Sequence, residues 1–187
     1  MRVARNGVWL ERLEDDDRGQ FVIDNQEAFL FGATQEFGMR DDHFEQDGQI
    51  ISRATIEQSI DEGEAWRIVQ DGKKVGGAIV KVEGDKGELE ILFTSPHAHG
   101  RGIGYVAWRE IEKAYPDVKI WGLVTPYFET RNIHFYVNRC GFHIVEFFNS
   151  RNPDLLVDGI AWANAVSDCH QLNILQEISR QFTRGQP

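Results

Sequence analysis

The sequence predicts a mixed α+β fold, in which a mostly antiparallel twisted sheet of about six to seven strands is flanked by helices. Short apolar runs separated by turn residues lie at 65–93, and an amphipathic helical pattern follows at 102–114. Another apolar run follows at 119–124. The first pattern is typical of an antiparallel meander, and a strand, helix and strand in succession indicate a parallel pair.

Length and composition fit a single domain over residues 1–187. The chain is 41% hydrophobic and 27% charged, which suits a globular core without disulfides. Its net charge of −10 argues against a nucleic-acid partner, and its apolar runs are too short to cross a membrane. Cys140 and Cys169 lack metal-ligand spacing and no apolar leader is visible, so we expect a cytoplasmic protein that binds no metal.

The first 64 residues carry weaker patterns than the segments that follow. An apolar stripe that ends at Phe37 predicts the first helix, and Ser52 or Thr55 is expected to cap the second. The predicted elements are a strand at 8–13, a solvated acidic turn at 14–19, a helix at 24–37, a polar loop at 39–49 and a short helix that ends near Gly63.

The segment 65–148 contains clearer elements. Asp71-Gly72 and the turn residues at 84–87 separate three apolar runs, which predicts two tight connections. Pro116 ends one helix and Gly141 ends the next. The predicted elements are strands at 65–70, 74–82 and 88–93, a helix at 102–114, a strand at 119–124, a helix at 130–140 and a strand at 142–148.

The segment 149–187 is predicted to be a C-terminal extension. Residues 149–159 are polar and rich in turn formers. Apolar residues at helical spacing then predict a long C-terminal helix over 160–182, packed on the core or on a second subunit. These residues are Val166, Cys169, Leu172, Leu175, Ile178 and Phe182.

A glycine-rich loop joins an apolar strand to an amphipathic helix within 87–115. Gly100, Gly102 and Gly104 remove side chains at this junction, so backbone N–H groups and the helix dipole can hold an anion. The chain has no Gly-Lys-Ser/Thr, which excludes a Walker A loop. A dinucleotide-binding motif has the pattern Gly-x-Gly-x-x-Gly/Ala, and Gly102, Gly104 and Ala107 are compatible with it. That motif belongs to a doubly wound parallel sheet, however, and the antiparallel meander predicted upstream argues against it. The loop is therefore a candidate phosphate cradle.

The loop sequence Pro96-His97-Ala98-His99-Gly100-Arg101-Gly102-Ile103-Gly104 resembles the acyl-CoA motif of the GNAT superfamily of N-acyltransferases, Gln/Arg-x-x-Gly-x-Gly/Ala. Gly102 and Gly104 match its glycines, while His99 stands where Gln or Arg is usual. The order of elements is also similar, which makes 65–148 the acyl-CoA core and 1–64 the acceptor side. The resemblance implies that the following residues bind coenzyme A: Phe93, Thr94, His99, Gly100, Arg101, Gly102, Ile103, Gly104 and Asn132.

A second similarity lies on the helix after the fifth strand. Phe135-Tyr136 and Gly141-Phe142 resemble an aromatic pair and a Gly-Phe stop of the family. Four residues separate Tyr136 from Gly141, where three are commoner, and Glu129 stands where Asn is usual, so Asn132 is the expected substitute. The resemblance implies that Tyr136 protonates the leaving thiolate; the alternative is that it only packs or hydrogen-bonds locally.

Transfer from a thioester also needs a polarised carbonyl and a base for the amine. A backbone N–H around Phe93, Thr94 or Ser95 is expected to polarise the carbonyl, because the family has a bulge there. Glu88 is the preferred base and Glu90 the second, since Glu88 lies fourteen residues before Gly102, as in some family members. A solvated pair of glutamates, or a water relay, is the alternative.

Regular alternation along this strand makes two predictions about its faces. One face is expected to carry Glu88, Glu90, Leu92 and Thr94, and the other Leu89, Ile91 and Phe93. Two carboxylates on one face beside an apolar cleft would have raised pKa values, which suits a base near neutral pH.

The acceptor is expected to be selected by the first 64 residues and the late loop. Aromatic and acidic residues there suit an amine with some apolar bulk, and an ordinary core with a solvated loop is the alternative. These residues are Phe29, Phe31, Phe37, Asp41, Asp42, Phe44 and Glu45. Cys140 has no triad-like partners, which favours direct transfer over an acyl-enzyme.

The sequence therefore predicts an N-acetyltransferase that moves an acetyl group from acetyl-CoA directly to an amine of a small molecule or peptide. The alternative is a non-catalytic acyl-CoA-binding or sensing module. A homodimer formed through the C-terminal segment is a further expectation.

Overall fold

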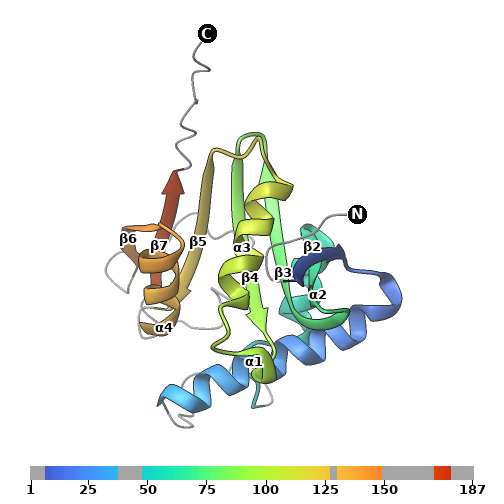
Figure 1. The fold of residues 1–187 in the computed structure, drawn as a ribbon. Coiled ribbons are helices and arrows are strands. Elements are labelled where there is room, and N and C mark those ends of the chain that lie inside the picture. Colours follow the sequence, from blue (N-terminus) through green and yellow to red (C-terminus); the bar gives the residue numbers. More distant parts are fainter. Residues whose placement is uncertain (1–6, 38–47, 127–129, 149–170, 178–187) are drawn as a thin grey trace.

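The computed structural model describes residues 7–37, 48–126, 130–148 and 171–177. Within these ranges the strands form one sheet in the order β1-β2-β3-β4-β5-β7-β6, with helices on both faces (Figure 1). The elements are β1 (Val8–Arg12), η2 (Asp15–Asp17), α1 (Arg18–Phe37), α2 (Arg53–Glu62), β2 (Glu64–Gln70), β3 (Lys73–Glu83), β4 (Lys86–Thr94), η4 (Pro96–Ala98), α3 (Ile103–Ala114), β5 (Ile120–Pro126), α4 (Thr130–Ile133), η5 (His134–Arg139), β6 (His143–Phe148) and β7 (Gln171–Glu177).

Strands β1 to β4 form an antiparallel meander. Asp71 and Gly72 both have positive φ, 50° and 76°, which is the backbone that a tight hairpin with right-handed twist requires. The crossover through α3 places β5 parallel to β4. The predicted mixed α+β class is therefore confirmed. None of the described helices is long and apolar enough to cross a membrane.

The position of β7 shows that the prediction of a continuous helix over 160–182 was wrong. Residues Gln171–Glu177 form a strand between β5 and β6 and run antiparallel to both. Leu172 and Leu175 have helical spacing, but Leu172 and Ile174 also alternate as in a strand. The strand is preferred because its backbone groups then find partners on both sides. The remainder of 149–187 beyond β7 lies outside the described residues.

The acidic segment before α1 is exposed at Glu14, Asp15 and Asp16, as the predicted solvated turn requires, but Asp17 is bonded to the sheet. The Arg67 Nε atom of β2 lies 2.6 Å from Asp17 Oδ2, and its Nη1 atom lies 2.8 Å from Asp24 Oδ2. These bonds connect η2 and the first turns of α1 to β2. Helix α1 consequently begins at Arg18, earlier than its apolar stripe predicted.

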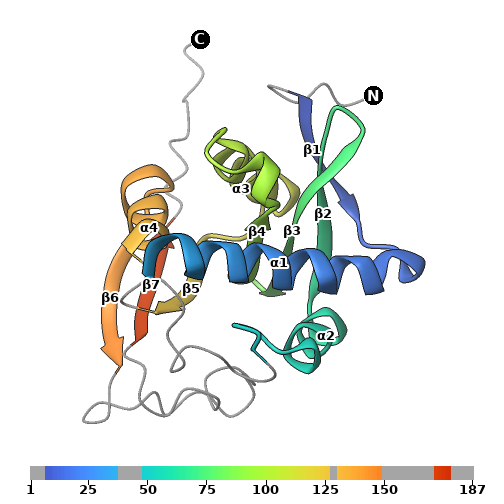
Figure 2. The ribbon, with the colours of Figure 1, turned by 90° about the horizontal axis from the view of Figure 1, so that it is seen from below.

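Helices cover both faces of the sheet (Figure 2). Each face has a core of its own. On the face covered by α3 and η5, the buried rings of Trp108, Trp121 and Phe142 pack together. On the other face, α1 and α2 bury Phe21 and Ile56. Of the two candidate caps, Ser52 is the residue that caps α2: its Oγ atom accepts a hydrogen bond from the Thr55 N–H at 3.1 Å.

Strand β4 contains a bulge that changes which face its side chains take. Ile79 pairs with Ile91 and Val80 with Leu89, so Glu90 has no partner in the register with β3. As a result Leu89 and Leu92 both pack on the α3 face, whereas Ile91 packs under α1 and α2. The predicted regular alternation over 88–94 was therefore wrong, because one extra residue is inserted at Glu90.

Strands β4 and β5 pair only at one end. The registered partners are Lys86–Glu88 with Ile120–Gly122. Beyond Glu88 the two strands diverge, and β5 leans towards β7 (Figure 1). Among the described residues, no strand pairs with the second half of the β4 edge that faces β5.

We predict that Arg67→Ala lowers the free energy of unfolding by about 3–5 kcal/mol, because it removes a buried guanidinium from between Asp17 and Asp24, of which Asp17 keeps, among the described residues, only the exposed Lys74 as a partner. The Arg67 side chain is only 2% exposed. Urea denaturation at pH 7 measures the change. The matched control is Arg53→Ala, which breaks an exposed pair with Glu57 and is expected to cost less than about 0.5 kcal/mol. Equal losses in the two variants would contradict the prediction.

The same cluster predicts a dependence on pH. Burial alone would raise the pKa of Asp17, but hydrogen bonds from Arg67 and Lys74 outweigh it and hold that pKa below its usual value. A depressed folded-state pKa stabilises the fold above the unfolded pKa of about 4, and this contribution disappears as the pH falls further. The wild type should therefore lose its advantage over Asp17→Asn below about pH 4 in the same assay. A constant difference from pH 7 to pH 3 would argue against it.

Candidate active site

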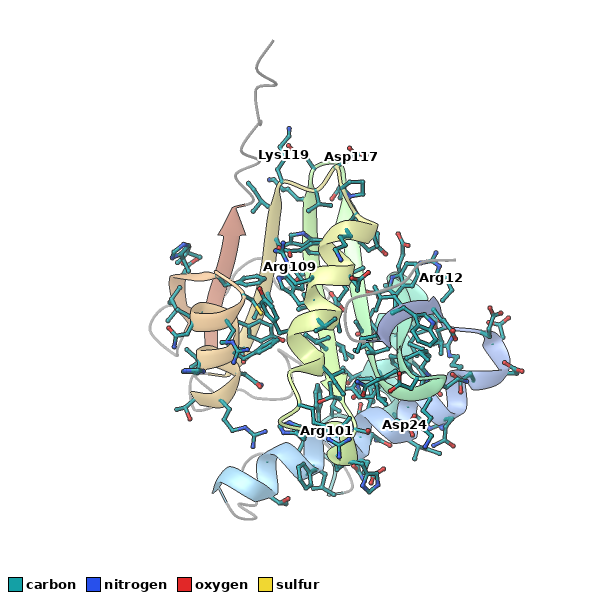
Figure 3. All side chains as sticks on the ribbon, in the orientation of Figure 1. Arg12, Asp24, Arg101, Arg109, Asp117 and Lys119 are labelled. Atoms are coloured by element: carbon teal, nitrogen blue, oxygen red, sulfur yellow. The ribbon has the colours of Figure 1, made fainter. Side chains whose placement is uncertain are left out.

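A cavity of about 400 Å³ lies where β4 ends, between the glycine loop, α1 and the α4–η5 segment. Most of the residues predicted from the acyl-CoA resemblance line it. They are Phe93, Thr94, His99, Gly100, Gly102, Ile103, Gly104, Asn132 and Tyr136. Arg101 does not line the cavity; it is exposed in the loop at the lower end of α3 (Figure 3).

The N-terminus of α3 forms the floor of the phosphate cradle. Gly102 precedes the helix with φ of 76°, a conformation that favours glycine. The Val106 N–H donates to the Gly102 carbonyl at 3.2 Å, which is the first bond of the helix. The amides of Ile103, Gly104 and Tyr105 precede that bond and have no acceptor within the helix. Three N–H groups and the positive end of the helix dipole therefore converge on an anion site.

The charged side chains that line the cavity are basic, as far as the described residues extend. They are Arg131 and Arg139, and the histidine of the loop, His99, lies beside them. Arg131 Nη2 lies 3.0 Å from His99 Nε2, and Arg139 lies over the ring of Tyr105 at 5.7 Å. The chain as a whole has a net charge of −10, so the positive charge of the cavity lining is opposite in sign to that of the protein. The cavity fits an anionic ligand such as a diphosphate.

The pairing of β4 distinguishes among the backbone amides of Phe93, Thr94 and Ser95, which are the three expected to polarise the thioester carbonyl. The Ser95 N–H is used, because it donates to the Val75 carbonyl of β3 at 2.9 Å. Amides alternate in direction along an antiparallel pair, so those of Leu92 and Thr94 face the opposite edge. That edge is open because β5 has diverged. Thr94 is therefore the best placed of the three, with Leu92 as a second donor.

Tyr136 lies on the π-helix η5, which accommodates the extra residue noted in the sequence. The Cys140 N–H donates to the Phe135 carbonyl at 3.1 Å, five residues back. The Phe142 N–H donates to the Tyr136 carbonyl at 3.0 Å, six residues back, where a glycine-ended α-helix spans five. The Tyr136 and Phe142 rings still pack, with centroids 5.6 Å apart. The added residue therefore widens the turn and keeps this contact.

The hydroxyl of Tyr136 has the protonation state that a general acid needs. The residue is only 9% exposed, and burial raises its pKa above the ordinary value for tyrosine. The phenol is therefore neutral at physiological pH and can donate a proton. Burial likewise raises the pKa of Cys140 to about 12, so this thiol is protonated and a poor nucleophile.

The structure does not bring Glu88 and Glu90 to the cavity. Glu90 is the bulge residue, and its side chain is 3% exposed. Its Oε1 atom lies 3.0 Å from Lys81 Nζ, an ion-pair distance without hydrogen-bond geometry. Lys81 also donates to Glu62 of α2 at 2.8 Å. Glu88 lies where β4 is still paired with β5. The base role of either carboxylate stays a prediction.

Sequence reasoning missed several residues that line the cavity. Arg131, Phe135 and Arg139 are spaced at i, i+4 and i+8, so a helical-face argument from Asn132 and Tyr136 would have found them. Ala28, Gly32 and Ile50 on the acceptor side carry no such pattern. Their neighbour Phe29 was predicted and lines the cavity. The acidic residues predicted beside it at 41–45 lie outside the described residues.

A glycine-rich helix N-terminus beside a splayed pair of parallel strands is the arrangement that the acyl-CoA resemblance led us to expect. The sequence model of the acetyltransferase (GNAT) family matches residues 9–142 of this chain. The chain therefore belongs to the GNAT acetyltransferase family, and the resemblance drawn from the loop is confirmed.

Known relatives agree with this assignment. An uncharacterised protein of Bacillus subtilis (strain 168), YrkN, is 42% identical over 158 residues, which cover 81% of this chain and 83% of that protein. Among solved structures, the ribosomal-protein-S18-alanine N-acetyltransferase of Escherichia coli has a TM-score of 0.62 at 17% identity, covering 96% of this chain and 99% of that one. A GNAT acetyltransferase of Elizabethkingia anophelis with acetyl-CoA bound has a TM-score of 0.60 at 14% identity, covering 93% and 100%.

We predict that Gly104→Ala raises stability and leaves the binding of coenzyme A nearly unchanged. A Cβ atom at Gly104 would lie 3.5 Å from the Phe135 ring, an ordinary contact, and alanine favours the helix by up to about 1 kcal/mol. The acyl-CoA motif has glycine or alanine at this position, so the added methyl group should change the affinity by less than about twofold. Thermal denaturation and calorimetric titration with coenzyme A measure the two effects.

Gly19→Ala is the matched control for this variant. Gly19 is also the second residue of a helix, and no described atom lies within 4 Å of its Cβ position. It should raise stability without changing the affinity. If Gly104→Ala binds coenzyme A about tenfold or more weakly than Gly19→Ala does, the match of Gly104 to the Gly/Ala position of the motif is refuted.

Proposed function

We propose that this protein is an N-acetyltransferase that moves an acetyl group from acetyl-CoA directly to an amine of a small molecule or peptide. One observation carries the proposal: the amides of the α3 N-terminus, the open edge of β4 and the hydroxyl-bearing Tyr136 all meet at a single cavity. Membership of the GNAT family supports acetyl transfer in general. The geometry of the cavity supports direct transfer from acetyl-CoA to an amine.

The cradle suits the diphosphate of coenzyme A. The N–H groups that open α3 are hydrogen-bond donors, and Arg131 and Arg139 add positive charge to the same cavity. The gap between β4 and β5 then offers the pantetheine arm a path with an unpaired backbone edge on one side. The Elizabethkingia anophelis protein has acetyl-CoA bound in its structure, which agrees with this role for a protein of the same fold.

The transfer step follows from the groups at the end of that path. The neutral amine attacks the thioester carbonyl carbon, so a C–N bond forms and the C–S bond breaks. The Thr94 N–H on the open edge stabilises negative charge that develops on the carbonyl oxygen. The Tyr136 hydroxyl gives its proton to the departing sulfur, and the proton released by the amine passes to a base or to solvent, from which the tyrosine is reprotonated.

The acceptor would enter from the side of α1. Ala28, Phe29 and Ile50 give this wall an apolar surface, which supports an amine with apolar bulk. The name of the Escherichia coli protein specifies an alanine N-acetyltransferase of a ribosomal protein, so this fold accommodates a protein amine. Glu88 or Glu90 as the base, a cytoplasmic location and a homodimer stay predictions.

We predict that Tyr136→Phe lowers kcat about 100-fold or more while the affinity for coenzyme A stays within about twofold, because only the proton donor is removed. Acceptor-dependent thiol release across an amine panel measures kcat. The raised pKa of Tyr136 also means that its ionisation does not reduce kcat below about pH 10.

Tyr115→Phe is the matched control. Its hydroxyl bonds Trp66 and Glu64 away from the cavity, so kcat should be unchanged. If kcat is the same for Tyr136→Phe and Tyr115→Phe, the role of Tyr136 as the general acid is refuted. If wild-type protein binds coenzyme A but releases no thiol with any amine, the chain is a binding or sensing module instead.

A further inference from the structure

We propose that Arg131 of α4, held in place by His99, is the side chain that binds the diphosphate of coenzyme A in this protein. The inference rests on the proposed function and names the phosphate-binding arginine within it. Two segments far apart in sequence meet at this pair: His99 belongs to the loop before α3, and Arg131 to the helix after β5. Both residues line the cavity that the α3 amides face.

The hydrogen bond between the two residues has a defined direction. An arginine side chain carries only donors, so the histidine nitrogen must accept. Arg131 Nη2 lies 3.0 Å from His99 Nε2 and 3.3 Å from Nδ1, which makes Nε2 the acceptor. The His99 ring also meets the Phe31 ring of α1 edge-on, with centroids 5.8 Å apart. The loop, α1 and α4 therefore all contribute to the position of the guanidinium.

This position distinguishes Arg131 from the other arginines near the cradle. Arg101 is exposed and does not line the cavity. Arg139 lines it, but its guanidinium lies over the ring of Tyr105. Of these three, it is Arg131 that is bonded to the loop whose neighbouring amides form the anion site. A guanidinium presents five N–H donors in a planar fork, and that fork matches two phosphate oxygens at once.

The first test is direct binding, without turnover. Calorimetric titration with coenzyme A should show about a tenfold to hundredfold weaker affinity for Arg131→Ala, as expected for the loss of a charge-assisted hydrogen bond. Dephospho-coenzyme A keeps the diphosphate and lacks the 3′-phosphate, so the same fold loss is expected with it. A loss that occurs with coenzyme A but not with dephospho-coenzyme A overturns the assignment to the diphosphate.

Arg109→Ala is the control for overall charge. Arg109 lies on the exposed side of α3 and pairs with Glu112, away from the cavity (Figure 3). It removes the same charge, so it should leave the affinity unchanged. Equal losses in Arg109→Ala and Arg131→Ala would reduce the role of Arg131 to long-range attraction and refute a direct contact.

The positioning role of His99 needs variants that separate hydrogen bonding from packing. His99→Gln keeps an acceptor and should bind coenzyme A nearly as the wild type does. His99→Leu removes the acceptor and should weaken binding about threefold to tenfold. In the double variant with Arg131→Ala the His99→Leu loss should vanish, because there is no arginine left to position. Additive losses would refute the positioning role.

A rescue variant tests the geometry further. Because the guanidinium of Arg131 lies at hydrogen-bond distance from the side chain at position 99, an arginine placed there reaches the same space. His99→Arg combined with Arg131→Ala should recover most of the lost affinity, and failure to recover it in a folded variant would refute the shared position. Thermal denaturation establishes that each variant is folded.

The proposed function and the role of Arg131 fail in different ways. If the wild-type protein does not bind coenzyme A, the proposed function fails. If the wild type binds coenzyme A and Arg131→Ala binds it equally well, the proposed function stands and only the role of Arg131 is refuted.

Discussion

The separation of β4 from β5 is the constraint on which the candidate site depends. The two strands pair over three residues and then diverge, so β4 ends beside the N-terminus of α3 with an edge that no described strand pairs. A buried strand edge without partners is costly, and a ligand that supplies an acceptor relieves that cost. The divergence therefore creates a path for an extended molecule and provides it with a donor. β7 completes the far side by pairing with β5 and β6.

The bulge at Glu90 has a related consequence. It inserts one residue opposite β3, so the side chains on either side of it are redistributed between the two cores. Glu90 is left facing Lys81 and α2, away from the residues that line the cavity. The π-helix that carries Tyr136 is a second one-residue adjustment, in which the turn widens and the Tyr136–Phe142 packing is kept. Both features are single inserted residues, one at Glu90 in β4 and one in the turn that follows Tyr136.

Charge is distributed unevenly between the body of the protein and its cavity. The chain has a net charge of −10, yet Arg131 and Arg139 line the cavity beside the positive end of α3. Elsewhere an arginine serves the fold: Arg67 is almost completely buried and holds Asp17 and Asp24 against the sheet. The buried cluster anchors α1, and α1 in turn lines one side of the cavity. The stability of the fold and the shape of the site are linked through this helix.

Local sequence determined the elements whose cause is local. The Asp71-Gly72 turn, the Ser52 cap, the glycine loop before α3 and the Gly141 stop all depend on backbone preferences within a few residues, and the structure has each of them. The sequence also sufficed to place the family, because the loop motif is contiguous. Only the tertiary structure decided the rest. The residues around Leu172 have helical spacing but form a strand that completes the sheet. The side chains of β4 were predicted to alternate regularly, but the strand contains a bulge. The contact between His99 and Arg131 joins residues that sequence spacing cannot bring together, because it depends on how α4 packs beside the loop.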